Sequence, residues 1–92
     1  NGDAPVNLIH RDDCIEIIDR IIEKDIWGET LNACADKHPV KRDFYTRAAR
    51  NAGLQVPEFD RSNHTAYKRV NSGRLKELLN FQFRYPDPME VI

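Results

Sequence analysis

The sequence has little of what several classes of protein need. Its 92 residues include two cysteines, and its net charge is −1 at neutral pH. Two cysteines without Cys-x-x-Cys spacing cannot form a disulfide-rich scaffold, and so small a charge gives no field that attracts nucleic acid or an anionic membrane. No apolar run approaches the roughly 18 residues of a membrane span, and the first five residues lack the basic and apolar regions of a signal peptide. We therefore expect a cytoplasmic protein with neither nucleic acid nor membrane among its partners.

The composition is that of an ordinary folded domain. Hydrophobic residues make up 40% of the chain and charged residues 32%, which is too apolar for a disordered segment. A chain of this length forms one domain at most, so residues 1–92 are a single domain or a fragment of one. Cys14 and Cys34 both fall in apolar stretches, and we predict that they are reduced core residues.

A strand followed by an amphipathic helix opens the chain. Residues 6–9 are mostly apolar, which predicts a short strand. Isoleucines then recur at helical spacing, which predicts a helix of about 11 residues. Asp13 stands at the start of this helix and Glu16 follows three residues later, an arrangement in which each carboxylate accepts a backbone N–H. We therefore predict that Asp13 and Glu16 are structural helix caps.

Strand-like and helix-like patterns continue to alternate along the chain, which is typical of α/β folds. We therefore predict an α/β unit of strand, helix, strand, helix, loop and helix. Two strands make a sheet that is barely stable without partners, which indicates that a portion is missing. The remaining predicted elements are a strand at 29–36, a helix at 41–52 that Gly53 ends, a loop at 54–66, an edge strand at 67–70, a helix that Asn71 or Ser72 caps and that ends near Asn80, and an apolar tail at 81–92.

Four segments in sequence order carry a resemblance to a known family. They are Asn7 to Asp13, Gly28-Glu29-Thr30-Leu31-Asn32, Pro39 to Leu54, and Lys68 to Leu75 together with Phe83-Arg84-Tyr85-Pro86. In this order they resemble the C-terminal part of extended and atypical short-chain dehydrogenase/reductases, the NAD-dependent epimerase/dehydratase family. The resemblance implies the C-terminal part of a Rossmann-type fold that lacks the dinucleotide-binding half. Two departures from the family pattern are Lys41, where a Ser or Thr helix cap is frequent, and Asn80, where glycine is frequent.

The cofactor elements of that family are missing from the sequence. A dinucleotide site needs clustered glycines, whereas the four glycines here are scattered along the chain. The family's acid/base pair is a Tyr with a Lys four residues on, but Tyr45, Tyr67 and Tyr85 are followed at that spacing by Ala, Asn and Met. We therefore expect no catalytic residue and no cofactor site in this chain, and NAD or NADP in a full-length parent.

Four basic residues are candidates for substrate contact. By the resemblance, the C-terminal lobe contacts the diphosphate of a nucleotide-sugar, and arginine provides charged, bidentate donors for such a group. The candidates are Lys68, Arg69, Arg74 and Arg84, and surface or packing roles are the alternative for each. Trp27, Phe81 and Phe83 are predicted to dock onto the missing half.

Two other groups of residues indicate structural roles rather than metal binding or catalysis. His10, Asp12 and Asp13 could suggest a metal or acid/base cluster, but the spacing matches no zinc pattern, and we expect no metal. The basic residues of the predicted helix at 41–52 are scattered over its polar side, which indicates a solvated face.

The sequence thus predicts the substrate-binding portion of an NAD(P)-dependent epimerase/dehydratase-like oxidoreductase, inactive by itself. Its expected partner is the missing N-terminal Rossmann half. A homodimer through an exposed strand edge is a further option, and the alternative function is a free-standing interaction or DNA-binding module.

Overall fold

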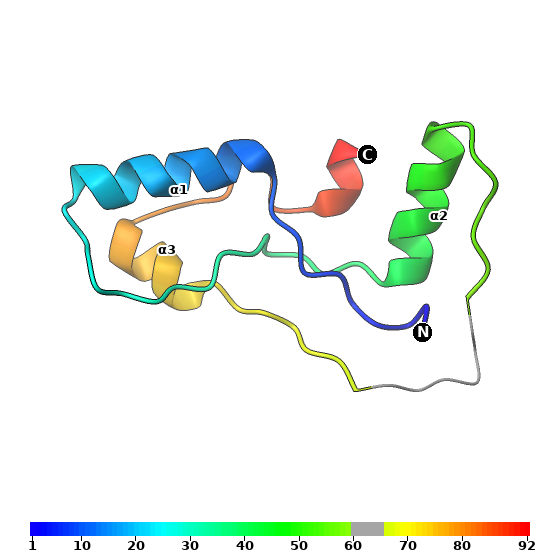
Figure 1. Ribbon diagram of the computed structural model, residues 1–92, viewed down its shortest axis with the longest axis horizontal. Coiled ribbons are helices and arrows are strands. Elements are labelled where there is room, and N and C mark those ends of the chain that lie inside the picture. The colour runs from blue at the N-terminus through cyan, green and yellow to red at the C-terminus, as the bar shows by residue number, and fades with distance from the viewer. Residues whose placement is uncertain (60–65) are drawn as a thin grey trace.

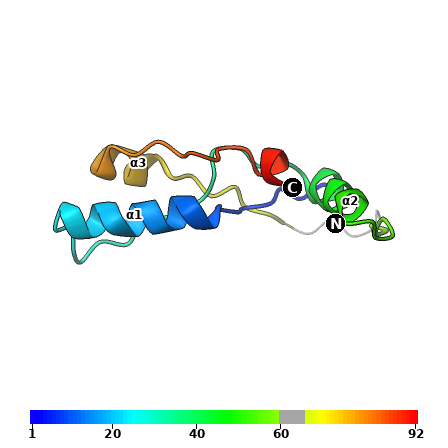
Figure 2. The ribbon, with the colours of Figure 1, turned by 90° about the horizontal axis from the view of Figure 1, so that it is seen from above.

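Four helical segments joined by extended chain make up the structure, a computed structural model that describes residues 1–59 and 66–92. The chain is a flat slab with extents of 46 × 29 × 16 Å. Helices α1 and α3 lie together at one end of the slab, α2 lies at the other, and extended segments run between them (Figures 1 and 2). The elements are α1 (Arg11–Glu23), α2 (Lys41–Asn51), α3 (Gly73–Leu79) and the short 3-10 helix η1 (Pro88–Val91).

Helix α1 begins earlier than the sequence predicts, and its cap is a different residue. His10 is the N-cap, and its Nδ1 atom accepts the backbone N–H of Asp12 at 3.0 Å. Asp12 and Asp13 lie in the first turn, where negative charge stabilises the helix N-terminus. The predicted capping box is therefore wrong, because Asp13 is already inside the helix and Glu16 is one turn further on.

Backbone carbonyl groups, rather than a side-chain cap, satisfy the start of α2. Its N-cap is Val40, which makes no side-chain cap hydrogen bond. The N–H of Lys41 instead donates to the Ala4 carbonyl at 2.8 Å, and that of Arg42 donates to the Gly2 carbonyl at 3.0 Å. The N-terminal segment thus satisfies the first backbone N–H groups of α2, as a Ser or Thr cap does in other helices. Gly53 follows the helix with a φ of 71°, as its predicted role requires.

The core lies between α1, α3 and the segment that follows α3. Ile17 of α1 packs with Leu75 and Leu79 of α3, and with Phe81 and Phe83. The two phenylalanine rings meet edge to face with centroids 5.1 Å apart. The apolar tail therefore lies against the chain as predicted, but the prediction that Phe81 and Phe83 dock onto another half is wrong. Asn80 adopts the left-handed conformation that ends α3, with a φ of 49°.

The predicted α/β fold is wrong. Among the described residues there is no strand and no sheet, and the one bridge is antiparallel, between Pro5 and Val40. The predicted strands at 6–9, 29–36 and 67–70 are extended but do not form a ladder. The predicted loop at 54–66 lies partly outside the described residues, and its part up to Phe59 is irregular. Residues 1–59 and 66–92 thus form a small helical structure without a Rossmann-type sheet.

Side chains form hydrogen bonds with backbone N–H and carbonyl groups that a β-ladder would otherwise use. The Ser72 hydroxyl accepts the N–H of Cys34 at 2.8 Å and donates to its carbonyl at 2.9 Å. Asn7 similarly binds the backbone on both sides of Arg69. Proline at position 5 has no N–H to donate. Isolated bonds remain, such as that from the Ala35 N–H to the Leu8 carbonyl at 2.7 Å. The alternation of apolar and small residues is therefore compatible with extended chain but not sufficient for a sheet.

Length and polarity exclude a membrane-crossing role for the helices of the described ranges. None is both long enough and apolar enough to span a bilayer.

Candidate functional site

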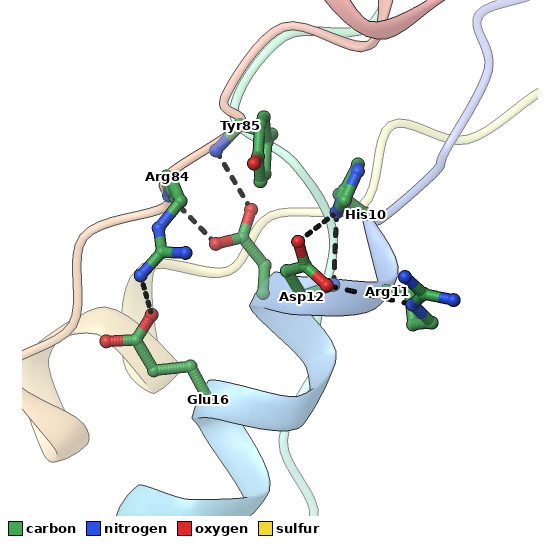
Figure 3. Close-up of polar contacts among 7 residues, drawn as sticks. His10, Arg11, Asp12, Glu16, Arg84 and Tyr85 are labelled. Carbon is green, nitrogen blue, oxygen red and sulfur yellow. Dashed lines mark hydrogen bonds and ion pairs between the residues drawn. The ribbon is translucent and has the colours of Figure 1, made fainter.

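A buried carboxylate ties the C-terminal segment to the first turn of α1. The Asp13 side chain is fully buried. Its two oxygens accept the backbone N–H of Arg84 at 2.8 Å and that of Tyr85 at 3.0 Å, as the dashed lines on these two residues show (Figure 3). The Tyr85 ring then stacks on the His10 ring, with centroids 3.9 Å apart. These contacts are structural, because both oxygens of the carboxylate are engaged.

Two of the four predicted substrate contacts are instead engaged in ion pairs. The Arg74 guanidinium lies 2.6 Å from a carboxylate oxygen of Glu29. The Arg84 guanidinium lies 3.8 Å from Glu16, which also pairs with Arg20 of its own helix at 3.6 Å (Figure 3). Arg74 and Arg84 are therefore each paired with a carboxylate, and the two carboxylates belong to different segments.

Asn7 positions the segment that carries the other two candidates. Its amide nitrogen donates to the Lys68 carbonyl at 2.8 Å, and its amide oxygen accepts the Val70 N–H at 2.8 Å. The two bonds bracket Arg69 and attach an extended, exposed segment to the chain between Val6 and Leu8. A side chain on a segment fixed in this way loses less freedom when it binds a ligand.

Arg69 lines a polar pocket of about 360 Å³. This pocket, called the Arg69 pocket below, is formed where residues 34–38 meet the segment before α3. Its size is in the range of small-molecule sites. Its lining residues are Cys34, Ala35, Asp36, His38, Arg69, Val70, Asn71, Ser72 and Lys76. The structure places Lys68 outside this pocket, so the candidates Lys68 and Arg69 do not both line it.

Among the described residues, one cation of the Arg69 pocket has no carboxylate partner. Lys76 and Asp36 neutralise one another, because their charged atoms lie 2.6 Å apart. The Arg69 guanidinium lies over the Tyr67 ring, 5.6 Å from its centroid. No carboxylate of the described residues lies within ion-pair distance of Arg69. An arginine in this state can bind an oxyanion of a ligand in bidentate fashion.

A cysteine and a histidine lie side by side in the same pocket, but they do not form a nucleophile and base. Cys34 Sγ lies 4.0 Å from His38 Nδ1, which is also 3.2 Å from the Val6 carbonyl oxygen. That carbonyl requires a proton on Nδ1, so the thiol has no acceptor there. Burial raises the pKa of the Cys34 thiol, a backbone hydrogen bond from Leu8 opposes this, and the charge of Asp36 adds to it. Cys34 is therefore a protonated packing residue.

The two cysteines differ from the prediction in one respect. Both are free, and Cys34 is buried as expected. Cys14 is exposed on the surface of α1, so its predicted core position is wrong. Helical spacing places it beside isoleucines that face outwards, and periodicity alone does not tell which apolar face a helix buries.

The sequence names Arg69 as a candidate but does not identify the residues that position its segment. Asn7 and Ser72 each make two hydrogen bonds to backbone more than 35 positions away. The available signal is a polar side chain within an otherwise apolar extended stretch, which Asn7 between Val6 and Leu8 provides. His38 is harder to recognise from the sequence as a pocket residue, because a histidine before a proline is equally typical of a turn.

The described residues do not fit a dinucleotide or a metal ion. Gly28 and Gly53 lie in separate turns, with φ of 75° and 71°, and Gly73 is the first residue of the short α3. No glycine-rich loop therefore forms at a helix start, where a pyrophosphate binds. Among residues 1–59 and 66–92, no group of three or more His, Cys, Asp or Glu side chains is arranged to hold a metal.

Comparison with known proteins shows relatives that are much longer than this chain. No family model matches it. Protein YeeZ of Escherichia coli (strain K12) is 34% identical over 90 residues, which are 97% of this chain and 33% of YeeZ. YeeZ of Escherichia coli O157:H7 gives the same values. A solved structure of a functionally unknown conserved protein from Silicibacter pomeroyi DSS matches with a TM-score of 0.74 and 24% identity, over 95% of this chain and 35% of that one.

These matches establish the fold of the chain and the share of its relatives' length that it spans, but they establish no activity. The structural match is below 25% identity, so it speaks for a shared fold alone. The chain spans about one third of the length of the curated relatives it matches.

Proposed function

We propose that this chain is the C-terminal, substrate-binding portion of an NAD(P)-dependent epimerase/dehydratase-like oxidoreductase that acts on a sugar nucleotide or a related polar substrate. The four sequence segments that resemble this family support the enzyme class. The lengths of the curated relatives, about three times that of this chain, are consistent with such a portion. The larger protein would bind NAD or NADP and carry the acid/base pair in residues outside this chain.

The observation that carries the proposal is an uncovered apolar face on α1. Ile15, Ile18 and Ile22 share one face of the helix, because they are spaced by three and four residues. Their exposed fractions are 51%, 51% and 57%. Figure 2 shows α1 along one side of the slab, with the segment that follows it looping past its C-terminal end. A contiguous apolar face on a small protein usually marks an interaction surface, and a dinucleotide-binding region would cover this one.

A second apolar element near α1 supports the same arrangement. Trp27 is 65% exposed, and its indole N–H is bound to the Asp25 carboxylate. Among the described residues, the backbone from Gly28 to Ala33 makes no backbone–backbone hydrogen bond. An extended segment in this state can pair with a neighbouring polypeptide. These features fit a chain that completes its packing against another region.

Arg69 is the residue that we assign to the substrate. It is the candidate that faces a pocket without being neutralised by a described carboxylate. A diphosphate or carboxylate of the substrate would receive its two parallel N–H donors. Arg74 and Arg84 are assigned to ion pairs with Glu29 and Glu16 instead. The role of this chain is then to bind and orient the substrate, since the proposal assigns the cofactor to residues outside it.

The first test measures the native gene product purified from its source cells. We expect an intact mass that corresponds to a polypeptide several times longer than 92 residues. We also expect bound NAD or NADP, detected by fluorescence after denaturation, and turnover of a sugar nucleotide. A product of only 92 residues would contradict the proposal. A longer product without a glycine-rich βαβ unit would contradict it as well.

The second test addresses Arg69 in that native product. We expect Arg69→Ala to raise KM for the substrate at least tenfold with a smaller change in kcat, because a binding contact is lost. Arg69→Lys should recover part of this loss, since it restores the charge but not the bidentate geometry. Arg74→Ala is the matched control, as it removes an exposed arginine that pairs with Glu29. Equal effects of Arg69→Ala and Arg74→Ala would exclude a specific role for Arg69.

A further inference from the structure

A second pocket lies between the start of α2 and the segment at 66–68, and its side chains are basic and aromatic. It has a volume of about 390 Å³. Lys41 and Tyr45 of α2, one helical turn apart, approach it from one side, and Tyr67 and Lys68 approach it from the other. We call it the lysine–tyrosine pocket. Its floor and remaining lining are Ala4, Pro5, Val6, Asn7, Leu8 and Ala66.

Hydrogen bonds to the floor fix both walls of this pocket. The α2 side is attached through the Lys41 N–H, which donates to the Ala4 carbonyl at 2.8 Å, and through the Val6 N–H, which donates to the Pro39 carbonyl at 2.9 Å. The opposite wall is attached by Asn7, whose amide binds the Lys68 carbonyl and the Val70 N–H at 2.8 Å each. The floor residues Ala4 and Val6 are buried, at 5% and 4% exposure. The pocket is therefore pre-formed rather than a gap between mobile side chains.

The charges of the lysine–tyrosine pocket favour an anionic ligand. None of the described residues that line it carries a carboxylate, and neither Lys41 nor Lys68 lies within ion-pair distance of one in the described ranges. The Arg69 guanidinium lies over the Tyr67 ring, 5.6 Å from its centroid, so a third positive charge is close to the pocket without lining it. Two lysines that converge on one depression repel each other, and an oxyanion placed between them removes that repulsion.

The tyrosines indicate that the ligand also contains a planar ring. Tyr45 is 44% exposed and Tyr67 is 53% exposed. The Tyr45 ring is oriented by Phe44, which it meets edge to face with centroids 5.4 Å apart. Exposed aromatic rings beside basic side chains are the usual surface on which nucleobases stack while their phosphates bind the cations. The combination is not needed for packing, because the core lies between α1 and α3.

We propose that the lysine–tyrosine pocket binds a planar ring that carries a phosphate, as in a nucleoside monophosphate. The ring stacks against Tyr67 or Tyr45, and the phosphate lies between Lys41 and Lys68. This inference does not depend on the proposed function, because its site is formed by Lys41, Tyr45, Tyr67 and Lys68, none of which the proposed function assigns to the substrate.

The test is a titration of the full chain, followed by NMR of its backbone amides, with adenosine 5′-monophosphate as the probe. We expect saturable shifts at Tyr45, Tyr67 and Lys68, and an affinity at least tenfold higher than that for adenosine or for ribose 5-phosphate. Each of those compounds offers only one of the two recognition elements. Affinity should fall as salt is raised, since the phosphate contacts are screened.

Substitutions separate specific binding from general charge. Lys68→Ala should weaken binding at least fivefold, whereas Lys37→Ala removes an exposed lysine outside the pocket and should leave it unchanged. Tyr67→Leu should weaken binding and Tyr67→Phe should retain it, because stacking needs the ring and not the hydroxyl. Circular dichroism shows whether each variant keeps its fold.

Three results would overturn the inference. The first is equal affinity for adenosine monophosphate and ribose 5-phosphate, which would mean that no ring is recognised. The second is an equal loss of binding in Lys68→Ala and Lys37→Ala. The third is binding of a single-stranded oligonucleotide without measurable binding of the mononucleotide, which would indicate a nucleic-acid surface instead.

Discussion

The buried carboxylate of Asp13 accepts the backbone N–H of Tyr85 at 3.0 Å, across 72 positions of sequence. Its second oxygen accepts the N–H of Arg84. This clamp attaches the end of the chain to the first turn of α1 and closes the core over Phe81 and Phe83. A residue that sequence patterns assign to a local helix cap is thus a long-range tether.

Asp13→Asn tests the tether. Asparagine keeps one acceptor but turns an N–H₂ group towards a backbone N–H, so one donor loses its partner. Hydrogen bonds to charged groups contribute roughly 1.5–3 kcal/mol each, and we expect the free energy of unfolding to fall by about 2 kcal/mol. Urea denaturation measures this change. Asp19→Asn, at an exposed position of the same helix, should stay within about 0.5 kcal/mol of the native protein. A similar loss in both variants would contradict a specific role for Asp13.

Ser72→Ala tests the two hydrogen bonds between the Ser72 hydroxyl and the Cys34 backbone, which stand where a sheet ladder is predicted. Ser72 is 6% exposed, and its hydroxyl satisfies both the N–H and the carbonyl of Cys34. Alanine leaves these two buried groups without a partner, at a cost of roughly 1–3 kcal/mol. We expect a loss of unfolding free energy in that range and faster hydrogen exchange at the Cys34 amide. Unchanged exchange at Cys34 would show that water or another group takes over these bonds.

The helices could be predicted from the sequence, but the way in which the chain packs could not. Isoleucine spacing predicts α1, and Gly53 and Asn80 mark helix ends that the structure confirms. The predicted strands at 29–36 and 67–70 fail because pairing depends on distant partners. There, the polar side chains of Ser72 and Asn7 take the bonds of a neighbouring strand. No local sequence pattern predicts whether a side chain or a neighbouring strand forms these hydrogen bonds.

Of the candidate site, only the charged side chains that could contact a ligand can be predicted from the sequence. Arginine is recognisable in sequence as a possible oxyanion contact, which identifies Arg69 and equally Arg74 and Arg84. The structure separates them, because Glu29 and Glu16 neutralise the latter two. Glu29 lies 45 positions from its partner Arg74, so neighbouring sequence gives no indication of the pair. The tether from Asn7 to the segment around Arg69 is equally remote.

The two cysteines should differ in reactivity and in their effect on stability. Cys14 is exposed and Cys34 is buried, so we expect one thiol to react with a disulfide reagent within minutes and the other only on unfolding. The pKa of Cys34 is raised in the folded state, chiefly by burial. The folded chain therefore holds this proton more tightly than the unfolded chain. Its contribution to stability is complete below the ordinary thiol pKa and is lost as the pH rises through the folded-state pKa.

A comparison of the native protein with Cys34→Ala isolates that contribution. The difference in unfolding free energy between them should be constant at neutral pH and should shrink in alkaline solution. Cys14→Ala serves as the control for the loss of an exposed thiol. A difference that grows with pH for Cys34→Ala would contradict a raised pKa.

The adjacent isoleucines Ile17 and Ile18 provide the sharpest test of the uncovered face of α1. Ile17 is 5% exposed and packs against Leu75 and Leu79, whereas Ile18 is 51% exposed. Ile17→Ala removes buried methyl groups and should lower the unfolding free energy by about 2–4 kcal/mol. Ile18→Ala should cost less than about 0.5 kcal/mol, since alanine is also the better helix former. Thermal and urea unfolding of the 92-residue chain measure both. If Ile18→Ala costs as much as Ile17→Ala, another surface already covers this face in solution, and it is not available to a dinucleotide-binding region.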